Sequence, residues 1–186
     1  MLENGWQPHP FRQFLLKVHS RCNLACDYCY VYTLADQSWR SRPMIMAPDL
    51  ITTAAERIAE HAARHHLSSV RLILHGGEPL LAGPAFLRKI VETVRAEVDQ
   101  DLRVDVSVQT NAVLLDEDTL RCFRDLNVQV GVSLDGGRRA NDAIGASPTA
   151  TAASPPSPVP FPCCSAHRSG ICTAGCFAPW IWPTNR

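Results

Sequence analysis

The chain has 186 residues, of which 46% are hydrophobic and 19% charged, and 18 basic residues balance 18 acidic ones. This composition is ordinary for a globular domain, and the balanced charge argues against a nucleic-acid or acidic-membrane partner. The N-terminus lacks the basic and apolar regions of a signal peptide. No apolar run approaches the roughly 20 residues of a membrane span, so we expect a cytoplasmic protein.

Short apolar runs alternate with segments of helical periodicity over the first 133 residues. We predict strands at 14–19, 70–74, 102–109 and 128–133, and helices at 48–66, 85–98 and 116–126. Cys122, inside the third helix, is expected to be a small core residue. Strands that alternate with helices are typical of α/β proteins with a parallel sheet.

The composition changes abruptly after Asp142. Residues 143–186 contain 8 of the 14 prolines, and their only charged side chains are Arg168 and Arg186. We therefore divide the chain into an N-terminal extension (1–10), a core (11–142) and a Pro/Ala/Ser/Cys-rich tail (143–186). The tail has no periodic apolar face that could offset the entropy of ordering it, so we expect it to be disordered and not to pair with the strand at 128–133.

Eight cysteines in a chain without an export signal predict metal or redox chemistry rather than structural disulfides. Cys22, Cys26 and Cys29 form a C-x3-C-x2-C loop directly after the first strand. Three thiolates on one loop can hold a [4Fe–4S] cluster and leave its fourth iron open to a small chelating molecule. A zinc site is the alternative, with His19 as a nearby fourth ligand. The tail cysteines (Cys163, Cys164, Cys172 and Cys176) lack a scaffold for a second site.

The loop and three further motifs resemble the radical S-adenosylmethionine (SAM) superfamily. The aromatic Tyr28 precedes the last cysteine, as in that family's C-x3-C-x-aromatic-C fingerprint. His75-Gly76-Gly77-Glu78-Pro79, Gln109-Thr110-Asn111 and Ser133-Leu134-Asp135-Gly136 follow at the ends of successive strands, where barrel enzymes assemble their sites. The resemblance covers residues 11–142. At a finer level the sequence resembles the SPASM-type peptide-maturase branch, in particular actinobacterial maturases of ribosomal peptides.

This resemblance implies a fold, two cofactors and a set of site residues. The fold would be the N-terminal half of a (βα)6 partial barrel, with about four parallel strands. Cys22, Cys26 and Cys29 would hold the [4Fe–4S] cluster. The residues implied to bind SAM are Gly76 and Gly77 beside the methionyl group, Glu78 at its ammonium, Ser133 and Asp135 at the ribose, and Tyr28 at the adenine. His75 and Asn111 would face the substrate.

The resemblance also implies the chemistry. One electron from a reductant would cleave SAM to methionine and a 5′-deoxyadenosyl radical, which abstracts hydrogen from a peptide or small-protein substrate. No nucleic acid or membrane is expected to take part. The alternative is a non-catalytic iron–sulfur or zinc binding fragment, and the SAM-binding set Glu78, Ser133 and Asp135 argues against it.

The tail has a second interpretation, in terms of the genetic code. In the reading frame one base earlier, residues 143–150 permit the peptide Arg-His-Arg-Arg-Phe-Ala-Asp-Gly, which is similar to what the maturases carry at this point. We therefore expect a frameshift near Asp142 that truncates the barrel. Resequencing the gene around codon 142 tests this expectation.

Overall fold

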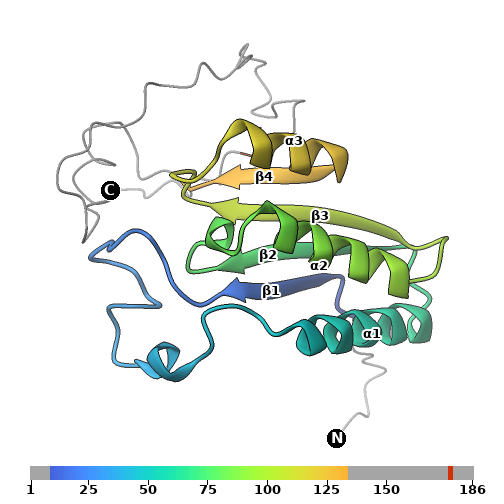
Figure 1. The fold of residues 1–186 in the computed structure, drawn as a ribbon. Helices are drawn as coiled ribbons and strands as arrows, with labels where there is room; N and C mark the ends of the chain where they lie inside the picture. Colours follow the sequence, from blue (N-terminus) through green and yellow to red (C-terminus); the bar gives the residue numbers. More distant parts are fainter. Residues whose placement is uncertain (1–8, 134–175, 178–186) are drawn as a thin grey trace, which may run out of the picture.

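The structure, a computed structural model, describes residues 9–133 and the backbone of Cys176 and Phe177. Four strands and three α-helices alternate along residues 9–133 (Figure 1). They are β1 (Gln13–His19), α1 (Pro48–Arg64), β2 (Ser69–Gly76), α2 (Pro84–Glu97), β3 (Arg103–Thr110), α3 (Glu117–Asp125) and β4 (Val128–Val132). Two short 3-10 helices, η1 (Ser38–Ser41) and η2 (Pro79–Ala82), lie in the loops after β1 and β2.

Each helix starts and packs as its sequence predicts. Proline occupies the first position of both α1 and α2, where its missing N–H has no intrahelical partner to lose. Asp116 caps α3 by accepting a hydrogen bond from the Thr119 N–H at 2.8 Å. The buried face of α1 consists of Ile51, Ala55, Ile58 and Ala62, at the spacing of one helical face.

The strands are all parallel and follow one another in the order β1-β2-β3-β4. This order never reverses, so right-handed crossovers place every helix on the same side of the sheet. In Figure 1 α2 crosses β2 and β3, and it contacts both α1 and α3. A doubly wound sheet would reverse its order and carry helices on both faces, whereas a barrel wall does not. The predicted partial barrel architecture of four parallel strands with helices is confirmed.

A fifth strand corrects one prediction about the tail. The two residues of β5 (Cys176–Phe177) pair in parallel with Val130 and Gly131 of β4. Backbone pairing needs no periodic side-chain pattern, so the composition of the tail gave no sign of it. The remaining predictions for residues 134–175 and 178–186, including disorder and the frameshift, lie outside the described residues.

The two faces of the sheet differ in polarity. The face toward the helices is apolar and is almost fully buried, with Val18, Leu74 and Val108 at 0–1% exposure. On the opposite face, Lys17 of β1 pairs with His75 of β2. The neighbouring row on this face runs Leu15, Ile73, Ser107 and Gln129 across the four strands. This second face therefore mixes apolar and polar side chains, and none of the described helices covers it.

Candidate functional site

The cysteine loop leaves β1 at a β-bulge. Lys17 pairs with His75 and His19 pairs with Gly76, so β1 carries one extra residue here. A bulge bends its strand and often lies beside an active site. His19 also forms an antiparallel bridge with Ile45, which ties the far end of the loop back to β1. The bulge therefore sets the direction in which the loop leaves the sheet.

Two backbone hydrogen bonds hold the start of the loop against the end of β2. The N–H groups of Gly77 and Glu78 donate to the carbonyl oxygens of His19 and Arg21, each at 2.9 Å. The approach is so close that a Cβ on Gly76 would collide with His19 O. A Cβ on Gly77 would collide with the Tyr32 hydroxyl and would lie 2.5 Å from Arg21 O. Both glycines are therefore needed for packing, before any ligand is considered.

The loop itself presents its three cysteines in a tight turn. The Leu24 N–H donates to Cys22 Sγ at 3.4 Å, and the Cys29 N–H donates to Cys26 O at 3.2 Å. The Thr33 N–H and hydroxyl both donate to Cys29 O, at 2.9 and 2.7 Å. All three thiols are half-buried.

The end of β3 reaches the same loop through Asn111. Its Nδ2 donates to Asn23 Oδ1 at 2.8 Å and lies 3.7 Å from Cys22 Sγ. Its backbone N–H donates to Glu78 Oε2 at 2.9 Å. The carboxyl ends of β1, β2 and β3 thus meet at one place, as parallel strands bring them together.

Glu78 is the most buried charged residue of this region, at 1% exposure. Its Oε1 accepts hydrogen bonds from the Leu80 N–H at 2.9 Å and from the Thr110 hydroxyl at 2.7 Å. With the Asn111 N–H on Oε2, the carboxylate joins the ends of β2 and β3. Each carboxylate oxygen can accept two hydrogen bonds, so Oε2 keeps capacity for one more donor.

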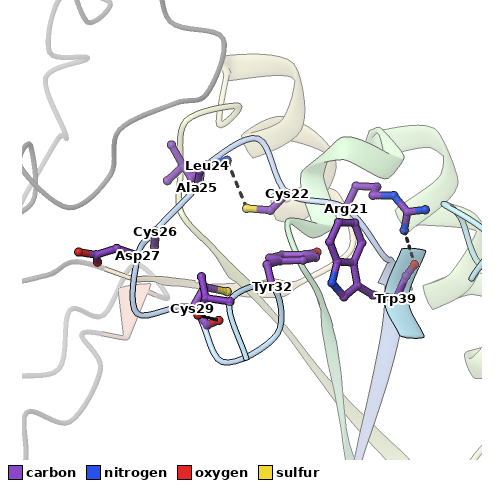
Figure 2. A pocket seen from close by; sticks show the side chains of 10 residues that line it. Arg21, Cys22, Leu24, Ala25, Cys26, Asp27, Cys29, Tyr32 and Trp39 are labelled. Atoms are coloured by element: carbon purple, nitrogen blue, oxygen red, sulfur yellow. Dashed lines mark hydrogen bonds between the residues drawn. The ribbon is translucent and has the colours of Figure 1, made fainter. Parts of the chain in front are cut away.

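The three cysteines line one cavity of about 330 Å³ (Figure 2). Figure 2 shows the sulfurs of Cys22 and Cys29 on one side and the neighbouring rings of Tyr32 and Trp39 on the other. The lining residues are Arg21, Cys22, Leu24, Ala25, Cys26, Asp27, Cys29, Tyr32, Thr33 and Trp39. The loop and η1 therefore enclose a space that is bordered by sulfur on one side and by aromatic rings on the other.

The aromatic wall is held in place by Arg21. The Tyr32 and Trp39 rings meet edge to face, with centroids 4.8 Å apart and an interplanar angle of 87°. The Arg21 guanidinium lies 5.1 Å from the Trp39 ring centre and donates to Trp39 O at 2.7 Å. Arg21 also donates to Ser20 Oγ at 2.9 Å. One cation thus ties the start of the loop to η1.

Burial shifts the pKa values of two cavity-lining groups so that their neutral forms are favoured. It raises the pKa of the Cys22 thiol, to which the nearby carboxylate of Glu78 also contributes. Burial, with the negative charge that Cys22 and Cys29 would carry, raises the pKa of Tyr32 to about 12. The Tyr32 hydroxyl therefore keeps its proton at neutral pH.

The residues present fit an iron–sulfur group better than a single ion. Within residues 9–133 no three His, Cys, Asp or Glu side chains converge on a point that could hold one metal ion. The three sulfurs instead border a cavity much wider than one tetrahedral zinc ion requires. Two buried donors of the wall, Tyr32 Oη and Trp39 Nε1, have no hydrogen-bond partner among the described residues. Thiolate ligands and unpaired donors suit a group rich in acceptor sulfurs.

The other predicted site residues divide into two groups. Gly76, Gly77 and Glu78 lie beside the cysteine loop, as described above. Tyr28 is 56% exposed and is not among the residues that line the cavity, while Ser133 is exposed and accepts a hydrogen bond from Gln109 Nε2 at 2.8 Å. Asp135 lies outside the described residues. Their assignment to SAM stays a prediction.

The sequence analysis missed the aromatic wall of the cavity. Arg21, Tyr32 and Trp39 had no assigned role, because only the cysteines of this segment carried a recognisable spacing. The signal available was an arginine directly before the cysteine loop and two aromatic residues shortly after it. That pattern alone does not distinguish a site wall from ordinary packing.

Comparisons with known proteins agree with this geometry. The family model of the radical SAM superfamily matches residues 16–152. A cysteine-type anaerobic sulfatase-maturating enzyme of Clostridium novyi is 31% identical over 123 residues, which is 66% of this chain and 32% of that protein. A serine-type enzyme of Bacteroides thetaiotaomicron is 30% identical over 133 residues, or 72% and 31% of the two chains.

Solved structures give the same result. Native anSMEcpe with bound AdoMet superposes with a TM-score of 0.63 at 28% identity, over 74% of this chain and 36% of that one. The same protein with AdoMet and the Cp18Cys peptide gives a TM-score of 0.61 at 27% identity, over 75% and 35% of the chains. The chain spans about a third of the length of these relatives. It belongs to the radical SAM superfamily, whose enzymes use a [4Fe–4S] cluster and S-adenosylmethionine.

Proposed function

We propose that Cys22, Cys26 and Cys29 hold a [4Fe–4S] cluster, and that SAM binds between it and the ends of β2 and β3. The observation that carries this proposal is that three thiols border one cavity beside the Gly76–Glu78 turn. When both cofactors are bound, they supply one-electron cleavage of SAM and a 5′-deoxyadenosyl radical that abstracts hydrogen from the substrate.

The chain's own residues would orient SAM. The remaining acceptor capacity of Glu78 Oε2 supports the prediction that this carboxylate accepts a hydrogen bond from the methionyl ammonium. Gly76 and Gly77 would present backbone without side chains at the methionyl group. Ser133 and Asp135 would bind the ribose hydroxyls, and Tyr28 would flank the adenine.

We further propose a peptide or small-protein substrate, bound on the open polar face of the sheet. Lys17 and His75 are paired neighbours on that face, and Gln109 lies near its carboxyl edge. Charged and amide groups of this kind bind the backbone and polar side chains of a peptide. The peptide-bound relative supports the same substrate class for this chain.

Anaerobic reconstitution tests the cluster. We expect about four irons and four sulfides per chain. Replacing Cys22, Cys26 or Cys29 with Ala should abolish iron binding, while Cys122→Ala, on the buried face of α3, should retain it. Stoichiometric zinc with no iron uptake would favour the zinc-binding alternative.

A second measurement separates an enzyme from a passive metal carrier. If SAM chelates the open iron, adding it should change the EPR spectrum of the reduced cluster. A cluster that forms but shows no spectral response to SAM would support the non-catalytic iron–sulfur fragment instead.

A further inference from the structure

Two hydrogen-bond donors in the wall of the cysteine cavity lack partners. Tyr32 Oη and Trp39 Nε1 are both buried, and neither contacts an acceptor within the described part of the chain. A buried donor without an acceptor is unfavourable, and such groups are rare unless a ligand supplies the acceptor. The two side chains touch edge to face, so both unpaired donors belong to one wall.

Tyr32 is the better placed of the two to reach a ligand held by the cysteines. Figure 2 shows its ring beside the sulfurs of Cys22 and Cys29, with the hydroxyl at the end of the ring nearer Arg21 and Trp39. Its hydroxyl packs against Gly77, and any residue with a Cβ at position 77 would collide with it. A tyrosine hydroxyl can both donate and accept a hydrogen bond, and this one has neither kind of partner among the described residues.

We propose that the Tyr32 hydroxyl donates a hydrogen bond to an anionic acceptor of the cofactor assembly held by Cys22, Cys26 and Cys29. The inference rests on the proposed function. Two acceptors share the required chemistry, namely a cluster or thiolate sulfur and the methionyl carboxylate of SAM. Tyr32 thereby acts as a positioning residue for the cofactors and does not touch the substrate.

The two acceptors predict different measurements. A hydrogen bond to cluster sulfur favours the more negative, reduced state, so removing it lowers the reduction potential. For Tyr32→Phe we expect about a tenfold fall in the ratio of reduced to oxidised cluster at a fixed potential, which is about 59 mV for one electron. If the acceptor is instead the methionyl carboxylate, Tyr32→Phe should leave the reduction potential without SAM unchanged. The variant should then need about tenfold more SAM to produce the EPR change.

The experiment compares the wild-type chain with Tyr32→Phe and with Tyr30→Phe. Tyr30 is 67% exposed, is not among the cavity-lining residues, and so controls for the loss of a tyrosine hydroxyl in the same segment. For each reconstituted protein, a redox titration of the cluster is followed by EPR, with and without SAM. If Tyr32→Phe matches Tyr30→Phe in both titrations, the inference is overturned while the proposed function stands.

The iron-free protein provides an independent readout. Because the Tyr32 hydroxyl has no partner there, Tyr32→Phe should keep or raise the midpoint of urea unfolding before reconstitution. A lowered midpoint would mean that the hydroxyl is bonded within the chain itself, and would overturn the inference. If the wild-type chain takes up no iron, the proposed function fails together with the inference built on it.

Discussion

Glu78 has a structural task that its motif did not suggest. The motif predicts a ligand for the SAM ammonium, yet the carboxylate already accepts three hydrogen bonds from the chain. These bonds join the ends of β2 and β3, which carry the turn and the asparagine beside Cys22. A substitution at this position therefore changes the scaffold as well as any contact to SAM.

The first prediction separates those two effects. Glu78→Ala leaves three donors unpaired, two of which are buried, and should lower the unfolding free energy by at least roughly 2 kcal/mol, at about 1–3 kcal/mol for each buried group. Glu78→Gln keeps one acceptor oxygen and should lose less. Urea unfolding measures both. Glu92→Ala, on the exposed side of α2, is the control and should change stability by less than about 0.5 kcal/mol. If Glu78→Ala resembles Glu92→Ala, the three hydrogen bonds do not form.

The Gln variant is accordingly the better probe of SAM binding. It removes the negative charge that would attract the methionyl ammonium and retains most of the scaffold. A weakened EPR response to SAM in a stable Glu78→Gln protein would support the ammonium contact. The same response in Glu78→Ala could come from a distorted turn.

The second prediction concerns His75 on the open face. Burial, with the nearby Lys17 cation, lowers the pKa of His75 below its ordinary value of 6.5, and its Nδ1 accepts a hydrogen bond from the Gly76 N–H at 2.7 Å. As the pH falls through 6.5, the unfolded chain binds a proton at this position and the folded chain does not. Stability therefore falls with pH over this window, until the lower folded pKa is reached.

To measure this effect, the unfolding free energies of the wild type and two variants are determined by urea unfolding between pH 7.5 and pH 5. His75→Gln cannot take up the proton, so its stability should fall less steeply than that of the wild type. His9→Gln, at an exposed position, should follow the wild-type curve. Parallel curves for wild type and His75→Gln would show that His75 titrates alike in the folded and unfolded chains.

Regular elements were predictable from periodicity, and irregular ones were not. The three α-helices begin and end within about two residues of the predicted positions, because the apolar spacing of residues such as Ile51, Ala55 and Ile58 repeats with the helix. The β1 bulge, η1 and η2 each depend on a few specific contacts. The Arg21 network that holds η1, for example, joins residues about 18 apart and leaves no periodic trace.

The same reasoning explains what the sequence revealed of the site. The cysteines and the Gly76–Glu78 turn have a recognisable spacing, because their chemistry fixes it. Tyr32 and Trp39 contribute through packing in three dimensions, which a linear pattern does not record. The assignments of Tyr28, Ser133 and Asp135 remain untested predictions.

At the level of single elements, the third prediction is for the N-terminus of α3. Asp116→Ala removes the acceptor for the Thr119 N–H and should lower the unfolding free energy by about 1 kcal/mol at pH 7. Asp116→Asn retains a capping oxygen and should stay near wild type. The Thr119 hydrogen bonds lower the pKa of Asp116 from 3.8, so the wild-type advantage should be lost progressively as the pH falls from 3.8 through that lowered value. Urea unfolding of the three proteins at pH 7 and at low pH checks both effects.

At the scale of the whole molecule, the two faces of the sheet differ in whether they are open to a substrate. Its helix-covered face is closed by α1, α2 and α3, and none of the described helices is long and apolar enough to cross a membrane. The opposite face presents Lys17, His75 and Gln109 at the edge that also carries the cysteine cavity. A substrate on that face would lie next to the cofactors.

The last prediction tests whether the tail belongs to the site. The described hydrogen bonds that join the cysteine loop, the Gly76–Glu78 turn and Asn111 all come from residues 19–111, at the ends of β1, β2 and β3. The described tail residues instead pair with β4, so β5 lies at the opposite edge of the sheet from β1. A chain that ends at residue 142 should therefore take up as much iron as the full chain. Cys172→Ala and Cys176→Ala should do the same, whereas Cys22→Ala should bind none.

Iron and sulfide analysis after anaerobic reconstitution decides this comparison, with urea unfolding of the shortened chain as a check on folding. A shortened chain that folds but loses its iron would show that the tail supplies a ligand or covers the cavity. If the tail supplies a ligand, the cluster would have four protein ligands and no open iron, and SAM could not chelate it in the proposed way. Equal iron in both chains leaves the fourth iron free for SAM, as the three-cysteine loop requires.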